Sequence, residues 1–456
     1  MTSISVQMTS DDHPRVLQET KVVLIWSFTV WLVVMNTTMF NVALPTVLMD
    51  LSITSSTASW IVSGYSIVFA IATLTFSRLS DYIPIGKLLL IGLTILGMAS
   101  MIGFLSNSFI LLLVARILQA AGAGAVPGLA MVLAGRYIPI SRRGRVMAYI
   151  SSAASLGFGL GPVLGGIITQ YLGWNYLFAV TGFVILLIPF FKKLLPEEEI
   201  KKVKFDTFGG LLTGLSVTGL LLFLSSFSFV YLICSIVLLL VMWRHIHQID
   251  MPFVQPKLLK NKRYMQLLSI GFFVFLTHFA TLFLMPIILT VVFFKDPAEV
   301  GLLIFPGAIL SAIAAQFIGR LIDQFGNLPI IIMGQLLLLI ATILFTLTST
   351  ISPYYILFTY MFMSTGFSAL TSSISNEISR ILTDEEIGAG MGMAQLFQFF
   401  GGAFGVTVTG IALTILHDMS QNLMYSIIFS GLVILILGGF MIIGFYIRNG
   451  ERRLSR

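Results

Sequence analysis

The chain has 456 residues, of which 57% are hydrophobic and only 10% are charged, and its mean hydropathy is +0.99. A soluble globular chain carries about 25% charged residues, so this composition excludes that class. The net charge of +7 would suggest nucleic acid in a soluble protein, but the basic residues here fall in short loops, where they indicate membrane topology. We therefore expect the lipid bilayer, and no nucleic acid, as a partner.

Apolar runs long enough to cross a bilayer recur throughout the sequence. Each is about 20 residues long, which predicts an all-α polytopic membrane protein rather than a β-barrel of short alternating segments. Residues 1–21 are polar and lack the apolar core of a signal peptide, so we interpret them as a cytoplasmic tail. Fourteen spans are predicted, beginning near residues 22, 58, 87, 109, 146, 174, 208, 228, 266, 299, 328, 353, 388 and 423.

The positions of Lys and Arg predict the orientation. With the N-terminus in the cytoplasm, every Lys and Arg except Arg116 and Lys295 lies on the inner side. So strong a bias places both termini in the cytoplasm. The single cysteine, Cys234, lies in an apolar run, and we expect neither an intrachain disulfide nor a metal site.

Arg116 is the one charged residue inside the run from Phe109 to Gly135. An arginine in mid-membrane costs about 3 kcal/mol on insertion scales and persists where it faces a bundle interior or a wet cavity. We interpret Arg116 as lining such a cavity, with Gln119 on the same helical face. The alternative is an arginine that snorkels to the outer interface.

His278 is the one titratable side chain predicted at mid-depth, because all 19 Asp and Glu fall in loops or at span ends. The unperturbed pKa of histidine is about 6.5, within reach of physiological pH. Our hypothesis is that His278 responds to protons and that Arg116 is a fixed cation that meets neutral or anionic parts of a substrate. The alternative is a neutral histidine hydrogen-bonded to a neighbouring helix. A cationic site without an acid disfavours strongly cationic compounds.

Uncharged polar residues within the spans complete the candidate cavity. They contact either substrate or neighbouring helices, the latter worth about 0.6 kcal/mol each. These candidates are Asn36, Asn41, Gln335, Gln395 and Gln398, of which the last two share a helical face.

An internal repeat divides the chain. The loop SRLSDYIPIGK after the second span recurs as GRLIDQFGN after the tenth. This predicts two six-helix bundles, residues 22–195 and 266–447, with an inserted helical pair at 206–245 and a cytoplasmic tail at 448–456. The fifth span carries a glycine-rich motif that the thirteenth matches with Gly401 and Gly405, and we expect these glycines to form the surface on which the halves rock. The motif consists of Gly157, Gly161, Pro162, Gly165 and Gly166.

At these residues the chain resembles the major facilitator superfamily, and within it the fourteen-span drug and proton antiporters. The resemblance implies a cytoplasmic gate, in which charges pair across the two halves when the inner mouth shuts. Its members here would be Arg78, Asp81, Gly86 and Lys87 in the first half and Arg320, Asp323 and Gly326 in the second.

A closer similarity is to the tetracycline-metal/proton antiporters of Gram-positive bacteria. It runs through NVALPTVLMDL, GAGAVPGLAMVLAGRYIP, GPVLGG, PFVQPKLLKN, IFPGA and GAGMG. The chain departs from that group where it carries membrane carboxylates, since the aligned residues are Thr37, Phe158 and Gly402.

The resemblance implies a multi-pass exporter of a bacterial plasma membrane. Working as a monomer by alternating access, it would move a small amphipathic compound, tetracycline-like or another drug, in exchange for protons and without a cofactor. The alternatives are a ligand-binding sensor or uncoupled transporter on the same fold, or an exporter of lipids or lipid precursors. A membrane enzyme is disfavoured because no nucleophile with an adjacent base and no phosphate loop is apparent.

Overall fold

The computed structural model describes residues 19–53, 55–195, 198, 206–249, 252–383 and 385–454, and every regular element within them is helical. The helices of the first half are α1 (Glu19–Asp50), α2 (Ser55–Leu79), α3 (Ile85–Phe104), α4 (Phe109–Ala123), α5 (Ala125–Tyr137), α6 (Ile140–Tyr171), α7 (Tyr176–Gly182), the 3-10 helix η1 (Phe183–Leu187) and α8 (Ile188–Leu194). Those that follow are α9 (Thr207–Ser226), α10 (Phe229–Ile246), α11 (Pro256–Lys260), α12 (Lys262–Val291), α13 (Pro297–Phe325), α14 (Asn327–Thr348), α15 (Pro353–Ile381), α16 (Ile387–Ile415) and α17 (Gln421–Leu454).

A helix begins near each predicted span start, and the all-α membrane fold is confirmed. Twelve helical stretches among the described residues are long and apolar enough to cross a bilayer. Two predicted spans fall outside that set. The apolar part of α9 is the shorter stretch Thr207–Leu220, and α15, although 29 residues long, is less apolar because its second half is rich in serine. The count of fourteen spans therefore stays a prediction.

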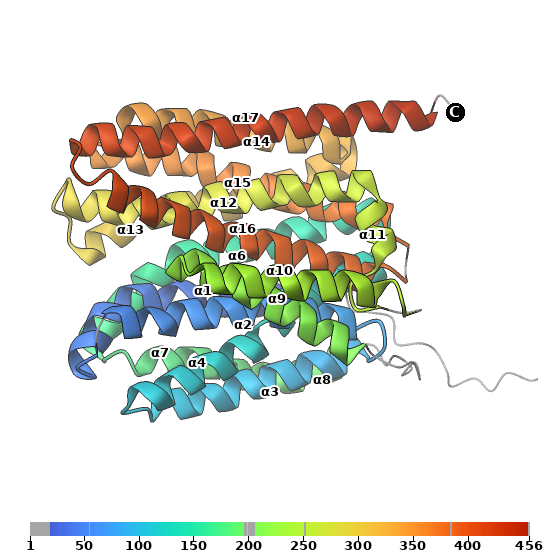
Figure 1. Ribbon diagram of the computed structural model, residues 1–456, viewed down its shortest axis with the longest axis horizontal. Helices are drawn as coiled ribbons and strands as arrows, with labels where there is room; N and C mark the ends of the chain where they lie inside the picture. The colour runs from blue at the N-terminus through green and yellow to red at the C-terminus, as the bar shows by residue number, and fades with distance from the viewer. Residues whose placement is uncertain are drawn as a thin grey trace, which may run out of the picture.

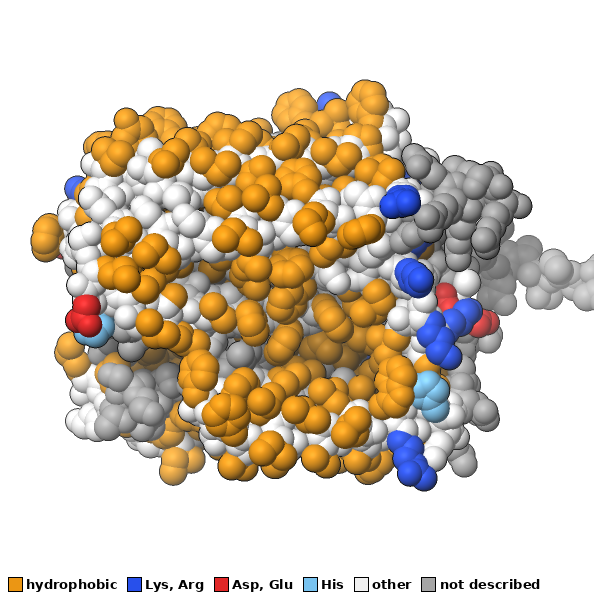
Figure 2. Space-filling view, turned by 45° about the horizontal axis from the view of Figure 1, so that its top comes forward, with side chains coloured by type: hydrophobic (Ala, Val, Ile, Leu, Met, Phe, Trp, Pro, Cys, Tyr) orange, Lys and Arg blue, Asp and Glu red, His pale blue; other side chains and the backbone are white. Residues whose placement is uncertain are grey.

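The helices form two bundles that lie side by side, α1 to α8 in one and α12 to α17 in the other (Figure 1). The pair α9 and α10 lies over the junction, where α9 packs against α2 of the first bundle and α16 of the second. The described start of α1 and the end of α17 lie at the same end of the molecule, where Lys and Arg gather (Figures 1 and 2). We call this the basic end.

The internal repeat is visible in the closest helix contacts. A Cβ added to Gly92 of α3 would lie 2.9 Å from the carbonyl oxygen of Gly122 in α4. In the second bundle a Cβ on Gly334 of α14 would lie 3.1 Å from the carbonyl oxygen of Gly366 in α15. Small residues thus let the same pair of helices approach in both bundles.

The glycine motif of α6 lies inside the first bundle, so the prediction that its stripe forms the surface between the halves is wrong. Added Cβ atoms on Gly157, Gly161 and Gly165 would lie 2.8, 2.8 and 2.6 Å from carbonyl oxygens of α1. Gly401 and Gly405 of α16 pack in the same way against α12. Pro162 lies within α6 on the same stretch. Glycine spacing identifies a close-packed face but not the helix that packs on it, which is why the sequence alone suggested the wrong partner.

Replacing Gly161 by Ala should destabilise the protein, because the new methyl group would meet both Thr38 Oγ1 and the Met35 carbonyl of α1. Overpacking of this kind costs about 1–3 kcal/mol. Gly166→Ala is the matched control, since its methyl group would lie at an ordinary 3.5 Å from Val42. Thermal unfolding in detergent should show a lower Tm for Gly161→Ala alone, and equal Tm values for the two variants would contradict the packing.

Candidate functional site

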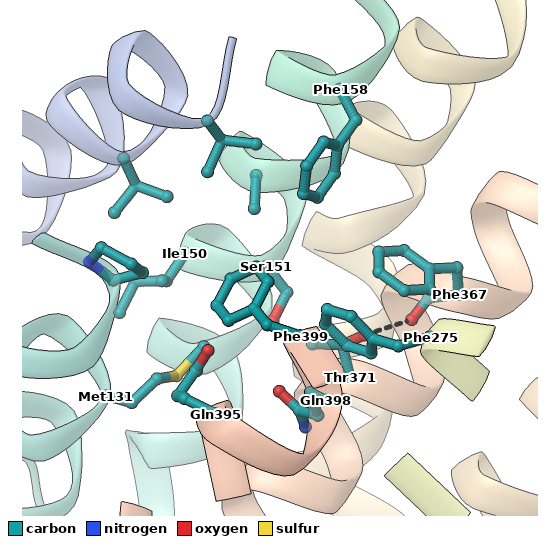
Figure 3. A pocket seen from close by; sticks show the side chains of 14 residues that line it. Met131, Ile150, Ser151, Phe158, Phe275, Phe367, Thr371, Gln395, Gln398 and Phe399 are labelled. Atoms are coloured by element: carbon teal, nitrogen blue, oxygen red, sulfur yellow. Dashed lines mark hydrogen bonds between the residues drawn. The ribbon is translucent and has the colours of Figure 1, made fainter. Parts of the chain in front are cut away.

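A small cavity of about 30 Å³ lies between the two bundles, lined by side chains of α1, α5, α6, α12, α15 and α16 (Figure 3). It has room for one or two water molecules and not for a drug-sized ligand. No side chain that lines it is charged. Its aromatic walls are Phe158 of α6, Phe275 of α12, Phe367 of α15 and Phe399 of α16.

The cavity presents polar groups with spare hydrogen-bonding capacity. Thr371 donates its hydroxyl hydrogen to the Phe367 carbonyl oxygen, 2.8 Å away, and so is engaged within α15. Within the part of the chain that the structure describes, Ser151 Oγ and Gln398 Oε1 have no partner. Gln395 also lines the cavity, beside Gln398 on α16. A bound compound could therefore find hydrogen-bonding groups from both bundles between aromatic walls.

Arg116 does not line this cavity and does not snorkel, so neither sequence-based interpretation describes its place. The side chain is 0% exposed inside the first bundle. Its guanidinium carbon lies 4.0 Å from the ring centres of both Phe40 and Tyr65. Aromatic faces of this kind stabilise a desolvated cation by about 2 kcal/mol or more.

Two amide oxygens accept hydrogen bonds from one nitrogen of the same guanidinium, while Nε and Nη2 have no partner among the described residues. Arg116 Nη1 donates to Asn36 Oδ1 at 3.3 Å and to Gln119 Oε1 at 3.1 Å. Gln119 in turn donates to Ser100 Oγ at 2.8 Å and to Thr181 Oγ1 at 3.0 Å. Asn36 and Gln119, which we also expected in the cavity, thus belong to a buried network that joins the helices of the first bundle.

His278 lies one layer behind the cavity wall, on α12. Its ring is 0% exposed and stacks on Phe367 with centroids 3.8 Å apart, and Tyr360 lies parallel at 6.2 Å. Neither ring nitrogen has a hydrogen-bond partner among the described residues, so the hydrogen bond of the alternative interpretation is not found there. As packed, the pocket suits a neutral ring, because a cation would have no described acceptor.

Two other candidates are placed differently from the cavity. Gln335 Nε2 donates to the carbonyl oxygen of Ile436 at 2.9 Å, which joins α14 to α17, so the prediction that Gln335 lines the cavity is wrong. Asn41 lies on α1, but its side chain falls outside the described residues.

The first gate motif lies at the basic end, where α2 turns into α3. Asp81 forms ion pairs with Arg78 and, at 3.2 Å, with Arg136 of α5. Arg78 is 1% exposed and also donates to the Pro252 carbonyl oxygen at 2.9 Å. A Cβ on Gly388, in the first turn of α16, would collide with the Asp81 carboxylate. This acid therefore lies against the start of a helix from the other bundle, where the helix dipole favours negative charge.

The other first-motif residues lie nearby. Gly86, in the first turn of α3, lies against Leu195, and Lys87 is exposed.

The second gate motif mirrors the first, with a change of partner. Asp323, near the end of α13, lies 3.9 Å from Arg145 of α6, and a Cβ on Gly144 would lie 2.8 Å from its Oδ1. Arg320 is exposed, so Asp323 faces the other bundle and not the arginine of its own motif. Gly326 follows α13 with φ of +82°, a conformation that favours glycine. Both acids thus bridge the bundles and close the basic end.

The class of protein follows from two repeated helical bundles, a cavity between them and charged contacts that shut one end: a membrane transporter. The chain belongs to the major facilitator superfamily, whose sequence model matches residues 26–406 and 267–455. The family and its transporter relatives indicate a transporter and not an enzyme.

Individual relatives are distant. The chain is 24% identical to the uncharacterized MFS-type transporter YhcA of Bacillus subtilis (strain 168), over 83% of this chain and 73% of that protein. It is also 24% identical to the riboflavin transporter RibZ of Clostridioides difficile (strain 630), over 84% and 83%. The crystal structure of the human organic anion transporter MFSD10 (TETRAN) shares the fold, with a TM-score of 0.71, 16% identity and coverage of 93% and 99%.

Sequence reasoning missed one cavity wall that the repeat could have revealed. Gln395 follows Ser151 in the sequence by the same number of residues as Gly401 follows Gly157, and Gln398 follows Ala154 by that number too. Ser151, Ala154, Gln395 and Gln398 all line the cavity. Applying the repeat to the two glutamines would have identified the wall on α6.

Asp81→Asn should open the basic end, because it removes the acid from two arginines, one of them buried. Breaking a buried pair costs about 3–5 kcal/mol. In a Cys234→Ser background, a cysteine in place of the buried Ser77 should react with a water-soluble maleimide at least about tenfold faster in the Asp81→Asn variant.

The control is Asp296→Asn, which changes an exposed acid at the opposite end of the bundle. Unchanged labelling of Ser77→Cys in the Asp81→Asn variant would show that these ion pairs do not hold the end shut.

Proposed function

We propose that this protein exports a small amphipathic compound by alternating access from a bacterial cytoplasm, across the plasma membrane, with both termini in the cytoplasm. The observation that carries the proposal is the cavity whose walls come from both bundles, with the basic end closed beside it. A rocking motion of the bundles would enlarge that cavity and expose it to one side at a time. We further propose that a single chain suffices, because the cavity is built within one chain.

The proposed substrate is flat, aromatic and without a strong positive charge. Four phenylalanines offer stacking surfaces, while Ser151 and Gln398 offer hydrogen bonds. The name of the relative RibZ refers to riboflavin, a compound of this kind. The similarity to tetracycline antiporters adds tetracycline and other drugs as candidates, and with them a role in multidrug efflux and antibiotic resistance. Because the cavity lacks a carboxylate, quaternary dyes would be poor substrates.

We propose the proton gradient as the energy source and His278 as the group that exchanges the proton. In the packed state the ring nitrogens have no described partner, so protonation requires Phe367 to move and water to enter. Tyr360 is the titratable side chain that stacks on His278. Arg116 is no longer proposed to meet the substrate, because its guanidinium lies between Phe40 and Tyr65 and does not line the cavity.

A second candidate function is transport without proton coupling, or ligand sensing, on the same fold. The specific observation in its favour is that no carboxylate lines the cavity among the described residues. A proton-coupled transporter normally places an acid at membrane depth. Export of a lipid or lipid precursor remains a third candidate, which the flux of a water-soluble aromatic compound would disfavour.

Gln398→Ala should lower the transport of riboflavin or of magnesium-bound tetracycline in proteoliposomes. Losing one hydrogen bond of about 1.4 kcal/mol in the transport transition state lowers kcat/KM about tenfold. Gln335→Ala is the matched control, since this glutamine bonds to Ile436 outside the cavity, and it should stay within about twofold of wild type. Equal losses in both variants would indicate that Gln398 acts through packing and not through the substrate.

His278→Gln and His278→Ala should both remove the part of the pH dependence of transport that His278 causes, since neither replacement titrates as histidine does. Energised everted vesicles with a pH-sensitive dye would report substrate-dependent loss of the proton gradient. Tyr360→Phe is the control, because it keeps an aromatic ring beside His278. If both His278 variants retain the wild-type pH profile, another group carries the proton or transport is uncoupled.

A further inference from the structure

A larger pocket of about 620 Å³ opens at the basic end, away from the central cavity. Its walls are α11, the start of α12, the end of α15 and the segment that leads into α16. Figure 1 shows α11 turned across the direction of the bundle, beside the start of α12. The pocket thus lies level with the ends of three helices, where a membrane protein meets lipid headgroups.

Positive charge dominates the lining. Four cations, Lys257, Lys260, Lys262 and Arg263, face one acid, Glu386. The hydrogen bond from Lys257 to Glu386, 2.8 Å long, raises the pKa of Lys257. Arg263 lies 3.4 Å from Glu377 and donates to the Tyr446 hydroxyl at 2.7 Å.

Two cations of the pocket are accessible to a ligand. Lys260 and Lys262 are exposed, and neither has an ion pair with another residue in the described ranges. Topology explains why lysines lie at this end, but it does not require them to converge on one walled pocket. Apolar Leu258 and Ile381 lie beside them in the lining.

We propose that this pocket binds the phosphate headgroup of an anionic phospholipid. Basic pockets between helices at a membrane surface bind such headgroups, and each Lys or Arg near the surface adds to the attraction. A soluble phosphate has the same charge chemistry. Two features favour the lipid. Apolar residues lie beside the lysines, where the glycerol and acyl chains of a lipid can pack, and the pocket lies at the helix ends, where lipid headgroups are found. This inference is independent of the compound that the central cavity carries.

The test compares the full chain in nanodiscs of phosphatidylcholine alone, of phosphatidylcholine with phosphatidylglycerol, and of phosphatidylcholine with added inorganic phosphate. Bound ligand stabilises the folded state, so phosphatidylglycerol should raise the Tm of wild type by a few degrees. Lys260→Gln/Lys262→Gln should lose at least half of that increase. Lys260→Arg/Lys262→Arg, which keeps both charges, should retain it.

The matched control is Lys192→Gln/Lys193→Gln, which removes two exposed lysines at the end of α8 and should keep the full increase. A full increase in Lys260→Gln/Lys262→Gln, or the same loss in the α8 variant, would overturn the site. An equal increase from inorganic phosphate in phosphatidylcholine discs would overturn the assignment to lipid and identify a soluble anion. In discs of phosphatidylcholine alone, each variant should have the Tm of wild type, which shows that the variant folds.

Discussion

The contact between Asp81 and the first turn of α16 is the interaction on which the arrangement of the two bundles depends. It joins a carboxylate of one bundle to a helix start of the other, and two arginines hold the carboxylate in place. The repeat produces a second such contact, between Asp323 and the start of α6. These two contacts close the basic end. The central cavity can therefore become larger only if the two bundles move relative to each other.

One pair of equivalent positions distinguishes the chemistry of the two bundles. His278 follows Asn36 in the sequence by the same number of residues as Asp323 follows Asp81, so Asn36 and His278 occupy equivalent positions of the repeat. In the first bundle Asn36 accepts a hydrogen bond from a permanently charged arginine. In the second, the histidine stacks on an aromatic ring of the cavity wall with both nitrogens unpartnered among the described residues. One bundle thus carries a fixed charge at this position, and the other carries the histidine that we propose as the proton-exchanging group.

Much of the fold follows from the sequence because its signals are local. Hydropathy located the helices, and the repeated loop around Asp81 and Asp323 predicted two equivalent halves. The site was less predictable, because helical periodicity shows which residues share a face but not which helix lies opposite. Gln335 and Gln395 look alike in sequence, yet one joins α14 to α17 and the other lines the cavity. Arg116 was misplaced for the same reason, since its aromatic neighbours come from α1 and α2.

The most direct test of alternating access is the distance across each end of the protein, measured between spin labels with and without riboflavin or tetracycline. Lys87 and Glu385 are exposed at the basic end, one in each half of the chain, and Met49 and Phe294 are exposed at the other. The account predicts that substrate changes the two distances in opposite directions, one end opening as the other closes. Distances that both stay fixed in protein shown to bind the compound, or that both lengthen, would contradict it.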